Sequence, residues 1–325
     1  MSTPVLKVRN LNIAFRGMNG LEAVVDGISF DLFAGEIVGL VGESGCGKSV
    51  TARALMGLLP AHTTKTSSVS MQLAGKELSG LDSRGWRQIR GRDMAMIFQE
   101  PSTALDPVFT LGQQINGVLR RHQNISRSDA KLKTISALEM GGFTDAMQVY
   151  HAYPHQLSGG MRQLAMIALA MATRPRILIA DEPTTALDVT TQTLVLEQLK
   201  HLRDEYATAV LLVTHDLGVV AQSCSRAMVM YCGRLVEQSE YTEMFHHPRH
   251  PYTKGLLEAV PRIHSGSGNY AKAIPGRVPS YKEYPPGCHF AERCSRADDL
   301  CLKKYPPIEY QNNSRVACHH PLGSK

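Results

Sequence analysis

Short runs of apolar residues alternate with helix-like segments through the first three quarters of the chain. Six runs have the length of a single strand and consist mainly of aliphatic residues: residues 5–8, 37–41, 94–98, 177–180, 210–213 and 227–231. Continuous apolar runs of this length are typical of parallel strands that are buried on both faces. Their alternation with helical segments is typical of a layered α/β fold. The pattern therefore predicts an α/β domain over residues 1–245.

The strand pattern is interrupted once and then ends. Between about residues 107 and 160 the strand signal is absent, and charged residues recur at helical spacing, which predicts a helical subdomain within the α/β core. Beyond residue 245 the chain is rich in Pro and Gly, which favour turns. We therefore expect an irregular extension over residues 246–325.

The charge is distributed unevenly between these two parts. Residues 1–245 contain 23 Lys and Arg against 23 Asp and Glu, whereas residues 246–325 contain 12 against 6, so the net charge of +6 belongs to the extension. A neutral domain without a basic, aromatic stripe argues against a nucleic-acid partner. No apolar run approaches the roughly 18 residues that cross a bilayer, and the first residues lack the pattern of a secretory signal. These features predict a protein that stays in the cytosol.

A phosphate-binding loop follows the predicted strand 37–41 and precedes a helical run. It reads Gly-Glu-Ser-Gly-Cys-Gly-Lys-Ser from Gly42 to Ser49, which is the Gly-x-x-x-x-Gly-Lys-Ser pattern in its expected context. Glycines allow backbone N–H groups to surround a phosphate, and the helix N-terminus adds a favourable dipole. Lys48 is expected to reach the β- and γ-phosphates, and Ser49 to bind Mg²⁺. The predicted nucleotide contacts here are Gly42, Ser44, Gly45, Cys46, Gly47, Lys48, Ser49 and Val50.

Two carboxylates end another predicted strand, residues 177–180. Asp181 suits a contact with Mg²⁺, and Glu182 suits polarising the water that attacks the γ-phosphate. A strand-end acidic pair on its own is more often a helix cap. With a phosphate loop upstream, the pair predicts hydrolysis of a nucleoside triphosphate.

The segment Leu157-Ser158-Gly159-Gly160-Met161-Arg162-Gln163 resembles the signature motif of ATP-binding-cassette (ABC) ATPases. Other elements of that family follow its order along the chain: Phe15 as the aromatic residue that stacks on adenine, Gln99 in the Q-loop, Asp188 in the D-loop and His215 as the switch histidine. The resemblance implies a P-loop NTPase of the ABC type that hydrolyses ATP.

The same resemblance implies a role for each matched residue. Glu182 is expected to be the general base and His215 to hold the γ-phosphate and the water. Ser49, Gln99 and Asp181 are expected to hold Mg²⁺. The signature residues Ser158, Gly159 and Gly160 are expected to complete the ATP site of an opposing subunit, because ABC ATPases close around two ATP molecules as dimers.

The sequence beyond the switch region is similar to one branch of this family. His247-Pro248-Arg249-His250-Pro251-Tyr252, then Ile274-Pro275-Gly276 and Pro286-Gly287-Cys288, resembles the extension of oligopeptide, dipeptide and nickel importer ATPases. The resemblance implies peptide import at the cytoplasmic face of the inner membrane. The implied partners are two transmembrane permease subunits, a second and distinct ATPase subunit, and an extracytoplasmic solute-binding protein. Import of nickel or another solute, and a soluble ABC ATPase acting on nucleic acid, remain alternatives.

Four cysteines lie in the extension: Cys288, Cys294, Cys301 and Cys318. Disulfides are uncommon in the cytosol, and structural zinc sites usually contain a Cys-x₂-Cys pair, which is missing here. Long, uneven spacings fit a [4Fe–4S] cluster better, and the resemblance to dipeptide-type ATPases implies the same group. Zinc, with His289, His319 or His320 nearby, and unligated thiols remain alternatives, as does a redox-sensing role.

Overall fold

The computed structural model describes residues 3–18, 20–185, 187–260, 272–311 and 314–323. The chain forms two compact units. The first consists mostly of residues 73–213, and the second brings together residues 7–31, residues 38–72 and the chain from residue 214 onward. These units divide the chain differently from the boundary near residue 245 that the sequence indicates, so the division into two domains stays a prediction.

The first unit is built on three parallel strands, β7 (Met94–Ile97), β8 (Ile177–Asp181) and β9 (Ala209–Thr214). Strand β8 lies between the other two, with Ile177 opposite both Met94 and Ala209. Every residue of the three strands is buried. Aliphatic runs are stable in this form only where both faces of the sheet are covered. The apolar runs at 94–98, 177–180 and 210–213 are therefore confirmed as strands.

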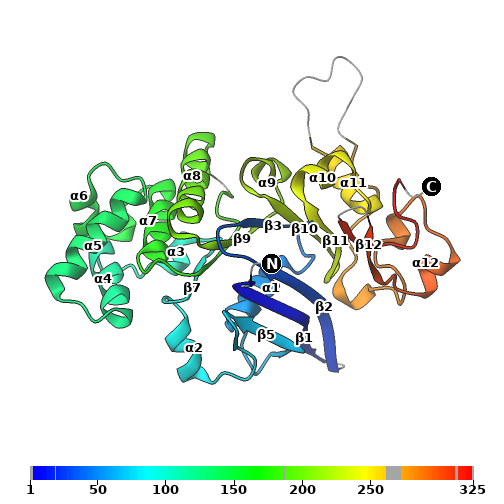
Figure 1. Ribbon diagram of the computed structural model, residues 1–325, viewed down its shortest axis with the longest axis horizontal. Helices are drawn as coiled ribbons and strands as arrows, with labels where there is room; N and C mark the ends of the chain where they lie inside the picture. The colour runs from blue at the N-terminus through cyan, green and yellow to red at the C-terminus, as the bar shows by residue number, and fades with distance from the viewer. Residues whose placement is uncertain (1–2, 19, 186, 261–271, 312–313, 324–325) are drawn as a thin grey trace, which may run out of the picture. The chain divides into compact units, whose positions relative to one another are not determined.

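Helices make up most of the rest of this unit. Its remaining elements are β6 (Lys76–Glu77), α2 (Ser83–Ile89), α3 (Pro101–Ala104), α4 (Leu111–His122), α5 (Arg127–Met140), α6 (Ala146–His151), the 3-10 turn η1 (Pro154–Gln156), α7 (Gly159–Met171) and α8 (Val189–Tyr206). Helices α4, α5 and α6 pack together (Figure 1) and lie within the stretch predicted to be helical. Thr110 and Ser126 cap α4 and α5 by accepting hydrogen bonds from backbone N–H groups that the helices leave unpaired. No helix in the described part of the chain has the length and apolarity that a bilayer crossing requires.

The second unit contains β3 (Ile37–Val41), β10 (Arg226–Tyr231) and β11 (Arg234–Glu240). Strand β3 pairs in parallel with β10, which pairs antiparallel with β11. Helix α1 (Lys48–Leu55) follows β3 through the phosphate loop, and α9 (Leu217–Ser223) packs against β3 so closely that a Cβ at Gly39 would lie 3.1 Å from Val220. The runs at 37–41 and 227–231 are thus confirmed as strands.

The second unit also contains a smaller sheet, whose first strand is longer than the sequence pattern indicates. It contains β1 (Leu6–Gly17), β2 (Gly20–Leu32), β4 (Thr64–Ser67) and β5 (Ser70–Leu73). Along β1 the buried positions change from Leu6 and Val8 to Leu11 and Ile13, hence from even to odd numbers. The change occurs at Asn10, whose φ of 53° lies in the left-handed region that Asn tolerates. The shift interrupts the alternation of buried and exposed positions along the strand. The sequence pattern therefore predicts a strand only up to residue 8.

The extension is more regular than the sequence indicates. After α10 (Tyr241–His246), which leads into it, the extension contains α11 (Pro251–Glu258), η2 (Tyr281–Glu283), η3 (Ala291–Arg293), α12 (Asp299–Lys303), β12 (Ile308–Gln311) and β13 (Ser314–Ala317). Strands β12 and β13 form a hairpin, and β13 pairs with β11, with Val316 opposite Glu237. The prediction of irregular structure is wrong for this hairpin, because the strand that pairs with β13 lies far back in the chain and local Pro and Gly content does not reveal it.

Candidate nucleotide site

The phosphate loop forms between the buried strand β3 and helix α1. Two of its glycines are required by space: a Cβ at Gly42 would lie 2.2 Å from the carbonyl oxygen of Met230, and one at Gly47 would lie 2.8 Å from the Met230 side chain. Gly47 also has a φ of 105°, which disfavours any other residue. The backbone of the loop can therefore lie directly against β10, with its exposed residues Ser44 and Gly45 facing solvent.

The side chain of Lys48, which is predicted to bind phosphate, is held inside the phosphate loop. Its side chain is almost fully buried, and Nζ donates hydrogen bonds to the carbonyl oxygens of Gly42 at 2.7 Å and Glu43 at 3.0 Å. An ammonium group has three donors, so the oxygens of a phosphate can be bound by the same group. Ser49 and Val50 follow in the first turn of α1 and are half-buried.

Cys46 is fully buried at the base of the loop. Burial raises the pKa of the Cys46 thiol above its ordinary value, although the neighbouring Lys48 lowers it. Burial likewise raises the pKa of Cys232 to about 12. A protonated, enclosed thiol is a poor nucleophile. Cys46 therefore acts in this loop as a small packing residue.

Phe15 and His215 are also placed in the second unit. Phe15 lies on β1 opposite Thr64 of β4 and is half-buried. His215 follows β9 and is exposed, and the next residue, Asp216, caps α9 by accepting hydrogen bonds from the backbone N–H groups of Gly218 and Val219. The cap fixes where α9 begins, directly after the histidine.

The carboxylates at the end of β8 lie in the first unit. Asp181 is buried, with 1% of its surface exposed, and Glu182 is half-buried. Gln99 Nε2 and Thr185 Oγ1 both donate hydrogen bonds to Oε2 of Glu182, at 3.1 and 2.9 Å. Glu182 also has a φ of 50°, a left-handed conformation that costs energy for a residue other than glycine. The structure thus brings Gln99 and Glu182 together, and it adds a contact between Glu182 and Thr185, a residue of the D-loop segment that the sequence does not link to Glu182.

The signature residues and the D-loop residue are neighbours within the same unit. Ser158 caps α7 by accepting a hydrogen bond from the N–H of Met161 at 3.2 Å, and Gly159 and Gly160 form the first turn. A Cβ at Gly160 would lie 3.1 Å from Thr191, and Thr191 donates hydrogen bonds to Asp188. These bonds lower the pKa of Asp188, so it is ionised at neutral pH. The N-termini of α7 and α8 therefore lie side by side.

The four cysteines of the extension lie close enough to interact electrostatically. Burial and then repulsion from the other three thiols raise the pKa of Cys318 to about 12, and burial raises that of Cys288 to about 11. The backbone N–H of Cys288 donates a hydrogen bond to the carbonyl of Cys301 at 2.7 Å. All four are free of disulfides. The extension thus gathers four thiols from a segment of 31 residues, 288 to 318.

Histidines near these thiols have other partners. His289 Nδ1 bonds to the carbonyl of Cys232 and His319 Nε2 to the carbonyl of Lys304. His320 bonds to Asp298, and among the described residues these two form with Cys301 the one group of three possible ligand atoms that lie within 4.8 Å of one another.

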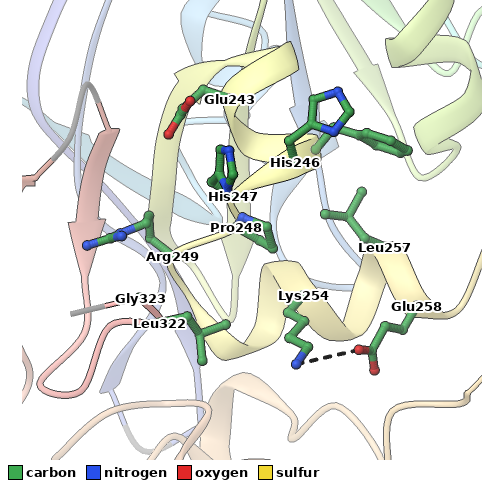
Figure 2. A pocket seen from close by; sticks show the side chains of 11 residues that line it. Glu243, His246, His247, Pro248, Arg249, Lys254, Leu257, Glu258, Leu322 and Gly323 are labelled. Carbon is green, nitrogen blue, oxygen red and sulfur yellow. Dashed lines mark ion pairs between the residues drawn. The ribbon is translucent and has the colours of Figure 1, made fainter. Parts of the chain in front are cut away.

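A separate hollow of about 730 Å³ lies beside α10 and α11 (Figure 2). Lys254 and Glu258 form an ion pair at its edge, with nitrogen and oxygen 3.7 Å apart. Its lining contains none of the predicted nucleotide contacts. The hollow therefore does not belong to the candidate nucleotide site.

Comparison with known proteins agrees with this geometry. Residues 25–185 match the family described as ABC transporter, and residues 236–301 match the C-terminal region of oligopeptide/dipeptide transporters. The chain is 46% identical over 97% of its length to a probable peptide ABC transporter ATP-binding protein of Sinorhizobium fredii, of which it covers 94%. It is 45% identical over 97% of its length to the oligopeptide transport ATP-binding protein AppD of Bacillus subtilis, of which it covers 96%. The chain belongs to the ATP-binding subunits of ABC transporters.

Solved structures support the same assignment. The chain resembles the ATP-binding cassette MJ0796, described in a dimeric, post-hydrolysis state bound to ADP and phosphate, with a TM-score of 0.65 and 25% identity over 73% of this chain and 98% of that one. The predicted fold class, a P-loop NTPase of the ABC type, is confirmed, and so is the predicted ATPase activity.

Proposed function

We propose that this ABC ATPase powers the uptake of peptides as one subunit of an importer. The observation that carries the proposal is the joint match to an ABC cassette and to the oligopeptide/dipeptide transporter C-terminal region on one chain. Its partners would be two transmembrane permease subunits, a second and distinct ATPase subunit and an extracytoplasmic binding protein. The ATPase would then bind at the cytoplasmic face of the membrane. Uptake of nickel or another solute by the same machinery is the second candidate.

Each step of hydrolysis would use residues placed above. Lys48 and the loop N–H groups would bind the phosphates. Ser49, Gln99 and Asp181 would hold Mg²⁺, which would supply positive charge to stabilise the transferred phosphoryl group. Glu182 accepts a proton from the attacking water, in an orientation set by its hydrogen bonds from Gln99 and Thr185.

Remaining contacts would come from the switch histidine and an opposing subunit. His215 bonds the γ-phosphate, and Phe15 stacks on the adenine. Ser158, Gly159 and Gly160 present the N-terminus of α7 to the ATP of the opposing subunit, with Asp188 beside them. Because ATP binds the closed dimer more tightly than the open one, binding and hydrolysis switch the permease between two states.

Uptake in cells tests this proposal. A strain that lacks the chain should lose uptake of a labelled dipeptide or oligopeptide, and the wild-type gene should restore it. The Glu182→Gln variant should not restore uptake although it is produced at the same level. Normal peptide uptake together with lost nickel uptake would replace the proposal by the second candidate.

We further propose that Cys288, Cys294, Cys301 and Cys318 hold a [4Fe–4S] cluster. Four free, mutually interacting thiols are the donor set that such a cluster uses. A zinc site made of four cysteines requires sulfurs about 3.8 Å apart, given Zn–S bonds of about 2.3 Å, and no three of these sulfurs form a group within 4.8 Å. When bound, the cluster would supply four bonds that cross-link the loops of the extension.

Metal analysis tests the cluster directly. Protein purified without oxygen should absorb near 400 nm and contain about four iron atoms per chain. Replacing Cys294 by Ser should remove the absorption, whereas the same change at Cys224, a buried cysteine directly after α9 and outside the group, should not. A colourless protein with one zinc per chain would overturn the cluster.

A further inference from the structure

An arginine of the extension forms an ion pair with the phosphate loop. Nη1 and Nη2 of Arg293 donate hydrogen bonds to the two carboxylate oxygens of Glu43, at 2.8 and 3.0 Å. The side chain of Arg293 is 5% exposed and that of Glu43 is 27% exposed. A bidentate, mostly buried ion pair of this kind fixes both the orientation of the carboxylate and its distance from the guanidinium group. Glu43 is the second residue of the loop, directly after Gly42.

The arginine is itself held in position. Its Nε donates a hydrogen bond to the carbonyl of Pro275 at 2.8 Å, and Nη1 also donates to the hydroxyl of Tyr231 at 3.3 Å. Burial alone would lower the pKa of Arg293, yet its bonds to Glu43 and Tyr231 raise it, so it is charged at all accessible pH values. The guanidinium group therefore cannot move without losing several partners.

A second residue of the extension binds the backbone of Glu43. The N–H of Glu43 donates a hydrogen bond to the hydroxyl of Tyr252, which is fully buried on α11. The ring of Tyr252 packs against those of Tyr231 and Phe290, at 4.6 and 5.3 Å between centroids. The carboxylate and the N–H of Glu43 are thus both fixed by residues 209 or more positions away.

The backbone carbonyl of Glu43 contacts residues that are predicted to bind ATP. Its carbonyl accepts hydrogen bonds from Lys48 Nζ at 3.0 Å and from the N–H of Cys46 at 3.4 Å. A rotation of Glu43 would therefore move the acceptor of Lys48 and turn the neighbouring loop N–H groups. Phosphate binding by such a loop depends on the convergence of those groups.

We infer that Arg293 and Tyr252 are positioning residues for ATP: they hold Glu43 so that the phosphate loop is arranged for phosphate before the nucleotide arrives. The extension then contributes to nucleotide affinity in its own chain, without touching the nucleotide. The inference rests on ATP binding by this loop and is independent of the transported solute.

The affinity of the full-length chain for MgATP, measured with a fluorescent ATP analogue, tests the inference. Arg293→Met should raise the dissociation constant about tenfold, since a buried charge-assisted pair is lost. Arg293→Lys should restore part of the affinity, because it keeps the charge and loses the two-pronged geometry. Arg277→Met removes an exposed ion pair elsewhere in the extension, with Glu283, and should change nothing.

A milder variant and a kinetic measurement exclude a merely structural effect. Tyr252→Phe deletes one hydroxyl and should weaken MgATP binding about threefold with little change in melting temperature. In the assembled transporter, Arg293→Met should raise KM for ATP and leave kcat within about twofold. A lower melting temperature with unchanged affinity and unchanged KM would overturn the inference. Failure of the wild-type chain to bind MgATP would instead count against the ATPase assignment.

Discussion

The phosphate loop and the end of strand β8 are both predicted to act on ATP, yet they are held in different ways. The loop offers backbone groups and is fixed by buried partners far along the chain, such as Met230, Tyr252 and Arg293. The strand end offers a carboxylate whose partners, Gln99 and Thr185, are exposed and belong to neighbouring loops. The difference teaches that binding of phosphate depends on the shape of a buried loop, whereas the chemistry depends on individual side chains.

The largest test of this contrast is Glu182→Gln. Loss of the general base should lower kcat by about a thousandfold, while MgATP affinity stays within about threefold because the loop is unchanged. ATPase assays and nucleotide titration measure the two effects. Glu197→Gln, an exposed change on α8, is the control. Substantial hydrolysis by Glu182→Gln would show that another group takes the proton.

The phosphate loop should instead be sensitive to substitutions that add volume at its glycines. Gly42→Ala would place a Cβ 2.2 Å from the carbonyl of Met230, and we expect it to lower the free energy of unfolding by about 3 kcal/mol and to abolish tight ATP binding. Gly45→Ala meets no atom within 4 Å but keeps a φ of 82°, so its cost should be about 1 kcal/mol. Denaturant unfolding measures both variants, and equal losses would contradict the steric explanation.

The pH dependence of alkylation at Cys46 tests how well the phosphate loop buries this side chain. Because burial raises the pKa of its thiol above the ordinary value of 9, the reactive thiolate is a minor form at pH 7, and its fraction grows about tenfold per pH unit from 7 to 9. Alkylation by a maleimide, followed by mass spectrometry, should be slow, faster at higher pH and fastest in urea. Protein that is modified at Cys46 and still binds ATP normally would contradict the placement of this residue inside the phosphate loop.

The smallest effect is expected at Thr185. Thr185→Val keeps the shape but removes one hydrogen bond to Glu182, so kcat should fall about fivefold while KM stays unchanged. Steady-state ATPase assays measure both constants. Thr193→Val on α8, which removes a hydroxyl bonded only to the backbone of Val189, is the matched control. An equal fall in both variants would remove Thr185 from the site.

Features of the fold that depend on neighbouring residues can be predicted from the sequence, whereas features that depend on residues far apart in the sequence cannot. The buried strands and the phosphate loop are local patterns, and residues 37–49 alone contain strand, turn and helix start. Strand β1 was only partly predicted because the left-handed turn at Asn10 shifts its alternation. The hairpin of the extension was missed because it depends on pairing between residues such as Glu237 and Val316.

The candidate site follows the same rule. Motif spacing identifies Lys48 and Glu182, because the chemistry needs fixed residue types at fixed spacing. Arg293 has no such signal, since it is one of twelve basic residues in the extension and only the fold shows its contact with Glu43.

The ion pair between Glu43 and Arg293 also has a consequence for biosynthesis. The two residues are 250 positions apart, and at a typical rate of about 5–20 residues per second the ribosome takes about 10–50 s to reach the second after making the first. A nascent chain therefore contains a complete phosphate-loop sequence long before it contains the residue that anchors it. By this inference, full affinity for ATP is reached only after Arg293 has been made, so nascent chains that lack this residue bind ATP less tightly.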